Sequence, residues 1–252
     1  MENQQTQNPQ EQENPQNNKS LFVVSSAIYS NHGVYDTKER LLQTIETCKS
    51  IHSRVDSCDI ILLDGGTSDL SDEEKDELNP YINEFYSYAD TENVKELQKS
   101  KNWDIVKNMI EIMIFGEYFE ENKQSIQKDY NRVFKVSGRY NLTNDFDYQY
   151  HLSAKNQIVI RGLYTSQFPP QVTGNVTLQY MSRLWSFDSS IINYISAVYK
   201  NMFDHMNDRL KSGGYIDIEH LLYHHLDCRH TKVVSKIGIE GNIAPNGQRI
   251  ND

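Results

Sequence analysis

Two short apolar runs flank one helical segment near the start of the chain. Residues 21–29 read LFVVSSAIY and residues 59–63 read DIILL, and short runs of this kind are typical of buried strands. Between them, Asp36 and Glu39 have the spacing of a helix capping box, and apolar residues recur every three or four positions from Leu41 to Val55. A strand, a helix and a second strand in this order form a βαβ unit, which predicts a parallel sheet with a right-handed crossover.

The second apolar run ends abruptly in DGGTSD, residues 64–69. Asp-Gly-Gly at a strand end has two explanations: a turn held by the Asp side chain, or a carboxylate and bare backbone offered to a ligand. In open α/β sheets, ligands bind at the carboxyl ends of the strands. The βαβ context therefore favours a site formed by Ser25, Ser26, Asp64, Gly65 and Gly66.

The rest of the chain continues to alternate helical and extended patterns. Ser71 and Glu74 form a second possible capping box, and residues 103–129 are predicted to form a long helix. Its expected buried face comprises Ile105, Met109, Ile112, Phe115 and Phe119. Further strands are predicted over 132–140, 157–164 and 176–187, and further helices over 188–213 and 216–227. We expect one α/β domain with a mixed, mostly parallel sheet flanked by helices.

Composition limits the partners and the location of the protein. Residues 1–20 are almost entirely Gln, Asn, Glu and Pro, which predicts a disordered tail. The 252-residue chain has a formal net charge of −10, which argues against general binding to nucleic acid or anionic membranes. Its three cysteines lack CxxC spacing, which indicates a reducing compartment. No apolar run approaches the ~18 residues of a membrane span, so we expect a cytoplasmic protein without a transmembrane segment.

Residues 21–70 resemble the opening of GT-A-fold, nucleotide-sugar-dependent glycosyltransferases, in particular those of family 2. In that family a second strand ends in an Asp-Asp/Gly-Gly-Ser-x-Asp pattern, and residues 64–69 stand at the matching places. The resemblance implies that Ser25 and Ser26 meet the base and ribose and that Asp64 accepts a hydrogen bond from them. It also implies a nucleotide-sugar-binding half over 21–140, an acceptor-side catalytic half over 141–240 and a carboxy-terminal tail over 241–252.

The segment FKVSGRYNLTNDFD, residues 134–147, departs from that family. There, a middle strand ends in an Asp-X-Asp that holds Mn²⁺ or Mg²⁺ against the diphosphate, but this chain has Ser137, Gly138, Arg139 and Tyr140. Two alternatives stay open. Arg139 could pair with the phosphates in place of a cation, with Lys135 adding charge, or Asp145 and Asp147 could form a displaced metal site. Without a ligand, Arg139 would instead make a structural ion pair.

A third segment, GGYIDIEHLLYHHLDCRH at 213–230, is rich in acids and histidines. The resemblance makes Glu219, or Asp217, the candidate general base for an acceptor hydroxyl, and His230 a candidate metal or phosphate ligand. His220 and His224 have the i, i+4 spacing of a metal pair, but the HExxH pattern of zinc hydrolases is absent. We therefore expect His224 and His225 to lie at the polar margin of an amphipathic helix.

The resemblance, taken with these residues, implies a glycosyltransferase of the hexosyltransferase class. It would move a sugar from a nucleotide-sugar donor to a hydroxyl of a glycan or another acceptor by single displacement, because no covalent nucleophile is assigned. The alternative is a non-catalytic protein that keeps the fold and binds a sugar nucleotide or a glycan, which the missing Asp-X-Asp favours. A nucleotidyltransferase would need a Gly-rich phosphate loop after the first strand, and SSAIYSNHG does not supply one.

Overall fold

The computed structural model describes residues 19–99, 103–243 and 246–252. The predicted disordered tail lies outside this range up to residue 18. Ser20, which the prediction placed in the tail, is the first residue of strand β1 (Ser20–Ser26), where its hydroxyl contacts Asn131 and Tyr148.

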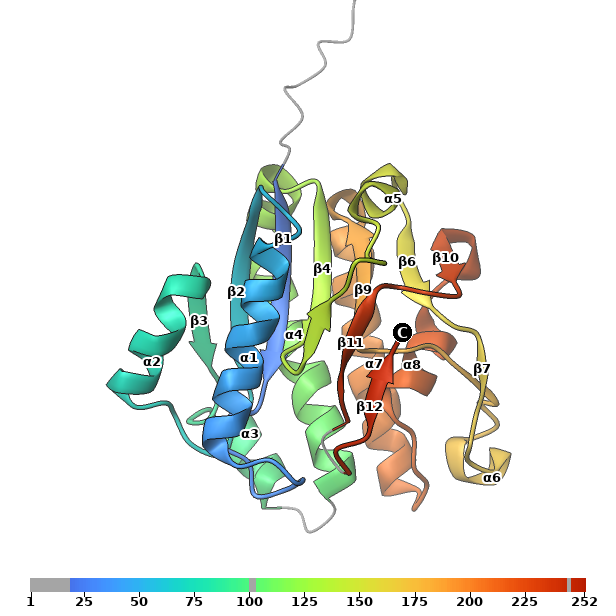
Figure 1. The fold of residues 1–252 in the computed structure, drawn as a ribbon. Helices are drawn as coiled ribbons and strands as arrows, with labels where there is room; N and C mark the ends of the chain where they lie inside the picture. The colour runs from blue at the N-terminus through green and yellow to red at the C-terminus, as the bar shows by residue number, and fades with distance from the viewer. Residues whose placement is uncertain (1–18, 100–102, 244–245) are drawn as a thin grey trace, which may run out of the picture.

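A seven-stranded sheet forms the centre of the molecule (Figure 1), with the order β10-β6-β9-β4-β1-β2-β3. Strands β1, β2, β3 and β4 are parallel, whereas β9 runs antiparallel to both of its neighbours, β4 and β6. The bounds are β2 (Cys58–Asp64), β3 (Glu84–Ser87), β4 (Arg132–Ser137), β6 (Ile158–Arg161), β9 (Leu184–Asp188) and β10 (Thr231–Val234). The predicted mixed, mostly parallel sheet is therefore confirmed.

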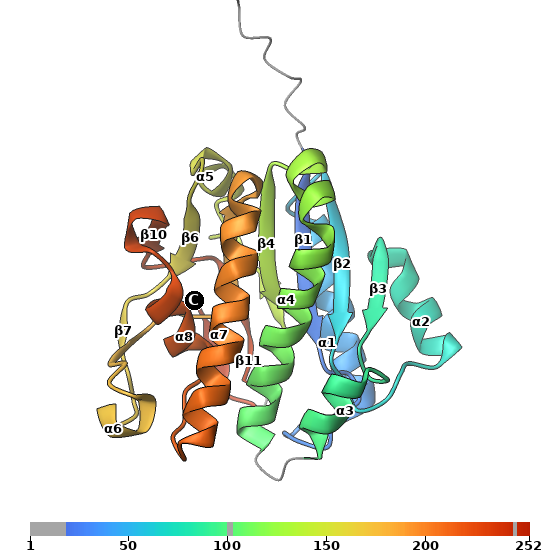
Figure 2. The same ribbon diagram turned by 180° about the vertical axis from the view of Figure 1, so that it is seen from behind.

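Helices cover both faces of the sheet. Helix α1 (Thr37–His52) lies on the face seen in Figure 1, whereas α4 (Trp103–Asp129) and α7 (Ile192–Lys211) cover the opposite face, seen in Figure 2. Both predicted capping boxes are present, at the start of α1 and of α2 (Asp72–Leu78). The remaining helices are α3 (Glu92–Gln98), α5 (Tyr148–Ser153), α6 (Pro170–Thr173) and α8 (Ile218–His225), with 3₁₀ turns η1 (Asn79–Tyr81), η2 (Ser189–Ile191) and η3 (Cys228–His230).

Three predicted extended segments are divided in the structure. The segment 132–140 turns after Ser137, where the Arg139 amide donates to the Ser137 carbonyl, and Tyr140 then begins β5 (Tyr140–Leu142). Segments 157–164 and 176–187 likewise contribute β6 and β9 to the main sheet and β7 (Tyr164–Thr165) and β8 (Leu178–Gln179) to a separate hairpin. The period-two pattern predicted extended backbone but not where the chain leaves the main sheet.

The carboxy-terminal residues fold back onto the domain. Strand β5 pairs antiparallel with β11 (Ile239–Asn242), and β11 pairs with β12 (Arg249–Asn251). Part of the predicted tail, residues 241–252, therefore belongs to a three-stranded sheet. The carboxylate of Asp252 is paired with Arg161 and Arg183.

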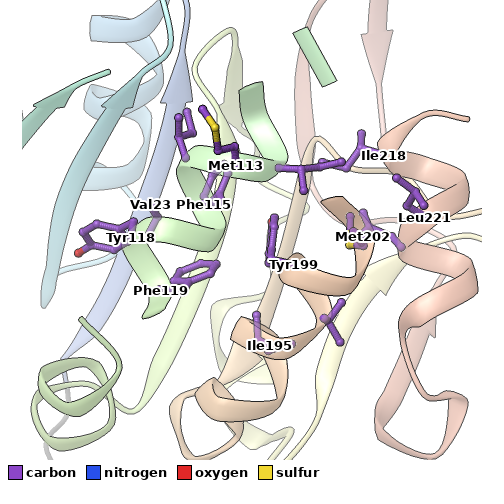
Figure 3. Close-up of a cluster of buried hydrophobic side chains, with 14 of the residues drawn as sticks. Val23, Met113, Phe115, Tyr118, Phe119, Ile195, Tyr199, Met202, Ile218 and Leu221 are labelled. Carbon is purple, nitrogen blue, oxygen red and sulfur yellow. The ribbon is translucent and has the colours of Figure 1, made fainter. Parts of the chain in front are cut away.

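The core has one layer on each face of the sheet, because successive residues of a strand point to opposite faces. Leu21 and Val23 of β1 face α4 and α7, whereas Phe22 and Val24 face α1. Figure 3 shows the first layer, in which Phe115 and Phe119 of α4 lie beside Tyr199 of α7. Met109, Ile112, Phe115 and Phe119 are buried as predicted, whereas the side chain of Ile105 lies outside the described residues. Among the described helices, none combines the length and apolarity needed to cross a membrane.

Candidate functional site

The carboxyl ends of three neighbouring strands meet at one edge of the sheet, as the sequence predicted. In the parallel register, Ser25 of β1 pairs with Ser137 of β4, and Ser26 pairs with Asp64 of β2. A cleft of about 870 Å³ opens beside these ends. Its walls come from the ends of β1 and β4, from α1 and α4, from the start of α8 and from the segment joining β8 to β9.

Asp64 does not reach this cleft. Its side chain is fully buried, and its carboxylate accepts hydrogen bonds from the Ser26 hydroxyl (2.6 Å) and from the amides of Ile28 (3.0 Å) and Gly66 (3.1 Å). Burial raises the pKa of Asp64, and these three donors oppose the rise. The predicted contact between Asp64 and a nucleoside is therefore revised. The carboxylate instead holds the end of β1 to the end of β2. It accepts from Gly66 in its own turn, as the first explanation of Asp-Gly-Gly predicted, and also from Ser26 and Ile28 at the end of β1.

The two glycines after Asp64 are also explained by contacts within the chain. A Cβ on Gly65 would stand 2.6 Å from a methyl group of Ile110 on α4, and one on Gly66 would stand 2.7 Å from the Asp64 carboxylate. Of the two, Gly65 lines the cleft and Gly66 does not. Close packing against α4 and the Asp64 carboxylate thus favours glycine at both positions. The predicted approach of a ligand does not apply to Gly66 and stays a prediction for Gly65.

Lys135 is buried beneath the cleft and is fully engaged. Its ammonium group contacts the Glu111 carboxylate (2.5 Å), the Ser137 hydroxyl (2.8 Å) and the Ser182 carbonyl (2.8 Å). An ammonium group has three protons, so these partners use its whole donor capacity. The predicted role of Lys135 as a point charge on a phosphate is therefore revised to that of a buried counter-ion for Glu111.

Glu111, on α4, lines the cleft and was missed by the sequence predictions. Burial raises its pKa, but Lys135 and Arg139 together outweigh burial and hold the pKa below its usual value. Ser25, predicted to meet a nucleoside, donates its hydroxyl to the same carboxylate at 3.2 Å. The available signal was an acid between Ile110 and Ile112 in an otherwise apolar stretch of a long helix.

Arg139 presents a cation to the cleft, and no acid among the described residues forms an ion pair with it. Its guanidinium lies 5.9 Å from the ring centre of Tyr140, and its buried Nε makes no hydrogen bond to the described residues. A buried donor without a partner is costly unless a ligand or water completes it. The predicted structural ion pair is thus absent from the described contacts of Arg139. A guanidinium that faces the cleft with a free Nε donor is suited to bind an anionic ligand.

Arg40 of α1 is a second cation in the cleft wall, and the sequence predictions missed it. Its guanidinium donates to the carbonyls of Tyr35, Ala27 and His32. Burial lowers the pKa of Arg40, and the nearby charge of Arg139 lowers it further. Two guanidinium groups that repel one another favour an anion bound beside them. No charge pattern along α1 distinguishes Arg40 from a solvated helix residue, so only the fold identifies it.

Gly138 and Tyr140 flank Arg139 in the chain, but only Tyr140 lines the cleft. The Gly138 amide donates to the Ser25 carbonyl at 2.8 Å, and a Cβ at this position would stand 3.0 Å from the same oxygen. Gly138 therefore holds the turn after β4 against the end of β1. Tyr140 is buried and lies under the guanidinium groups of both Arg139 and Arg183.

Glu219 faces the cleft from the first turn of α8. Its carboxylate accepts a hydrogen bond from the Ser182 hydroxyl at 2.5 Å. Burial and the neighbouring charge of Asp217 raise the pKa of Glu219 to about 7, which Ser182 only partly opposes. A carboxylate with a pKa near neutrality is suited to accept a proton, since it is both partly ionised and basic at pH 7.

Asp217 serves a different purpose from Glu219. It caps α8, accepting from the His220 amide at 3.0 Å and contacting the His220 ring nitrogen Nδ1 at 2.5 Å. The other ring nitrogen of His220 lies 2.7 Å from the Ser166 hydroxyl. Asp217 borders the cleft, but both of these contacts hold the start of α8, so of the two predicted acids Glu219 is the better placed base.

The predicted metal ligands lie away from this cleft. Asp145 pairs with Lys236, and Asp147 caps α5 by accepting from the Tyr150 amide; both border a separate depression. His230 is exposed and contacts the Asn156 carbonyl through Nδ1. The structure therefore does not bring Asp145, Asp147 or His230 to the carboxyl ends of the strands.

The residues at the end of β4 do not fit a divalent cation. Mn²⁺ and Mg²⁺ prefer carboxylate oxygens, but this strand end offers the Ser137 hydroxyl, Gly138 and the Arg139 guanidinium. Within the described part of the chain, the acids of the cleft form no group of three whose ligand atoms lie close enough to share an ion. Beside this strand end, the cleft wall carries the guanidinium groups of Arg40 and Arg139.

Comparison with known proteins identifies the fold. No protein-family model and no curated protein matches the chain. Among solved structures, core-mannan synthase A (CmsA/Ktr4) from Aspergillus fumigatus, in a Mn/GDP form, matches with a TM-score of 0.54. The match covers 92% of this chain and 76% of that chain, at 13% sequence identity. The chain has a GT-A-like fold. In this GT-A-like fold the cleft lies at the carboxyl ends of β1 and β4, where α/β sheets bind ligands.

Proposed function

We propose that the protein is a glycosyltransferase that moves a sugar from a nucleoside-diphosphate sugar to an acceptor hydroxyl. The observation that carries this proposal is one cleft, in a GT-A-like fold, that contains both a guanidinium whose Nε has no hydrogen bond to the described residues and a carboxylate with a pKa near 7. One solved structure with a matching fold is a core-mannan synthase in a Mn/GDP form. That likeness supports a sugar nucleotide as the donor.

At the donor end, Arg139 would bind the phosphates. A guanidinium pairs with two phosphate oxygens at once and stays charged at any working pH. The charge of Arg40 adds to the positive field at the same wall of the cleft. We propose that these groups stabilise the leaving diphosphate without a divalent cation, because the end of β4 offers no carboxylate pair to hold one.

At the acceptor end, Glu219 would be the general base. In a single displacement, the acceptor oxygen attacks the anomeric carbon and its proton passes to a Glu219 carboxylate oxygen. The bond between that carbon and the phosphate oxygen breaks, and the diphosphate leaves with the electron pair. Ser182 would fix the orientation of the carboxylate through the hydrogen bond that it already donates.

The proposal is tested by titrating the full chain with UDP, GDP and CDP sugars, with and without added Mn²⁺, while following nucleoside-diphosphate release. We expect saturable binding of at least one donor, with less than about a twofold gain in affinity from Mn²⁺. Transfer to a hydroxyl acceptor should depend on Glu219. Failure of every donor to bind would refute the proposal, and a strict requirement for Mn²⁺ would refute the metal-free binding of the diphosphate.

The second candidate is a binding protein that keeps the fold without turnover. The absence of a carboxylate pair from the end of β4 favours it. Donor binding with neither transfer nor donor hydrolysis, across a panel of glycan and simple hydroxyl acceptors, would support this alternative.

A further inference from the structure

Three histidines from two helices meet outside the cleft. His205 comes from α7, and His224 and His225 come from the last turn of α8. One ring nitrogen from each histidine lies within 4.8 Å of those of the other two. Among the described residues, these three histidines are the group of His, Cys, Asp or Glu side chains close enough together to share a metal ion. None of the three lines the cleft.

The spacing of these nitrogens is close to that of a metal site. Zn–N bonds of 2.0–2.1 Å in tetrahedral geometry place neighbouring ligand nitrogens about 3.3 Å apart. His205 Nδ1 and His225 Nε2 already lie 3.1 Å apart. The His224 ring lies 4.8 Å, between centroids, from each of the other two rings, and His224 is exposed.

The helices hold this arrangement in place. The Tyr194 hydroxyl of α7 donates to the His225 carbonyl at 3.2 Å and accepts from the Asp227 amide at 2.6 Å. Helix α7 packs along α8 (Figure 2), and its buried Met202 lies one turn before His205. The histidine backbones are therefore positioned by contacts that do not involve the imidazole rings.

The His205 and His225 rings face one another through Nδ1 and Nε2, the atoms by which imidazole binds a metal. The 3.1 Å contact between them needs a proton on one of the two facing nitrogens, and a shift of tautomer to the opposite ring nitrogen frees both lone pairs for an ion.

The charged groups around His205 leave the site open to a cation. Asp208 lies one turn after His205 and places a negative charge near its ring. Arg209 places a positive charge near the same ring, but its guanidinium donates to the carbonyls of Gln171 and Val172. The Arg209 guanidinium is therefore directed to the α6 segment.

We propose that His205, His224 and His225 bind one Zn²⁺ ion that cross-links α7 to α8, with water in the fourth position on the exposed side of His224. Three imidazole nitrogens select zinc and its late first-row neighbours, whereas Mg²⁺ and Mn²⁺ prefer oxygen ligands. The site does not depend on the proposed transferase activity. It would fix the carboxyl end of the short helix whose first turn carries Glu219.

The experiment uses the full chain without a histidine tag, freed of metal by a chelator. Zn²⁺ is titrated in competition with a chromophoric chelator, and Co²⁺ is titrated in parallel to follow the visible d–d absorption of tetrahedral cobalt. We expect saturation at one equivalent, no competition from Mn²⁺, and a higher melting temperature with Zn²⁺, since binding to the folded state alone stabilises it.

The variants separate this site from scattered surface binding. His224→Gln alters an exposed ring and should leave the fold intact while weakening Zn²⁺ binding by more than about tenfold and removing the thermal shift. His205→Gln should do the same from the other helix. His230→Gln and His52→Gln, at exposed histidines outside the group, are the matched controls. The absence of saturation at one equivalent, or equal weakening in the controls, would overturn the proposal.

Discussion

At the scale of single residues, Glu219 gives the sharpest prediction, because its pKa affects stability as well as activity. Its pKa is raised from 4.5 to about 7 in the folded chain, mainly by burial. The folded state therefore binds this proton more tightly than the unfolded state does. The associated stability is fully present below pH 4.5 and is lost as the pH rises through about 7.

In Glu219→Gln this titration is absent. We expect the melting temperature of the variant, relative to the wild type, to increase between pH 5 and pH 8, and transfer activity to fall by about 10²–10⁴-fold. Thermal unfolding of both proteins across this pH range is the measurement. Parallel curves would show that the environment of Glu219 does not shift its pKa.

Arg139 gives a prediction about the donor. Charge-assisted hydrogen bonds are each worth about 1.5–3 kcal/mol, so Arg139→Ala should weaken nucleoside-diphosphate binding by about ten- to hundredfold. Arg139→Lys should recover part of the affinity, since it keeps the charge but loses the bidentate geometry. Isothermal titration with UDP and GDP measures both effects.

The matched control for Arg139 is Arg229→Ala. Arg229 is exposed and pairs with Asp227 at a distance from the cleft wall. Its removal should leave nucleotide affinity unchanged. Equal affinities for wild type and Arg139→Ala would remove Arg139 from the proposed site.

The residues of the site differ in how far the sequence could identify them. Glu219 and Arg139, which line the cleft, were predicted because a resemblance assigned a role to their positions. Arg40, Glu111 and Ser182 were missed because their importance comes from tertiary contacts with residues far along the chain. Lys135 was assigned to a phosphate because a lone cation in a strand does not reveal the acid that neutralises it.

At the scale of elements, the ends of β1 and β2 depend on one carboxylate. Asp64→Ala removes three hydrogen bonds and leaves the donors of Ser26, Ile28 and Gly66 without their acceptor. Each net bond contributes about 1 kcal/mol, and buried unsatisfied donors cost more, so we expect a loss of about 3 kcal/mol or more in the free energy of unfolding. Urea denaturation measures it.

Asp69→Ala is the control within the same segment. Asp69 is partly exposed and pairs with Lys75, an interaction expected to be worth about 0–1 kcal/mol. If Asp64→Ala cost no more than Asp69→Ala, the buried carboxylate would not be what joins the two strands.

Helix α4 and strand β4 are linked by the pair of Glu111 and Lys135. Lys135 is fully buried, so Lys135→Met leaves the Glu111 carboxylate without its counter-ion, which we expect to cost about 3–5 kcal/mol. The double variant Glu111→Leu with Lys135→Met removes both charges and should recover a large part of that loss. Urea unfolding of the single and double variants tests this coupling, and additive losses would contradict it.

The elements themselves were easier to predict than their boundaries. Both capping boxes and the βαβ unit follow from local chemistry, namely short polar side chains at helix starts and apolar periodicity. The divisions at Ser137 and between β6 and β7 were missed, because an extended segment has the same pattern in the main sheet and outside it.

At the scale of the whole molecule, the predicted nucleotide-sugar-binding half (21–140) and acceptor-side half (141–240) form one structural unit. Strand β9, from the second half, pairs with β4, from the first, and so continues the sheet of the βαβ unit into the second half. Helix α7 then packs its Tyr199 against Phe115 and Phe119 of α4. Because neither half encloses its own core, we expect a single cooperative unfolding transition.

Two spectroscopic probes test this expectation. The chain has two tryptophans, so Trp103→Phe leaves Trp185 of β9 as the single fluorescent reporter, fully buried between β4 and β6. Its fluorescence and the far-ultraviolet circular dichroism of the whole chain should give coincident urea transitions. A fragment ending at residue 140 should show no cooperative transition, because it loses both the partner of β4 and the cover of α4. Two separated transitions, or a cooperatively folded fragment, would mean that the first half holds a core of its own.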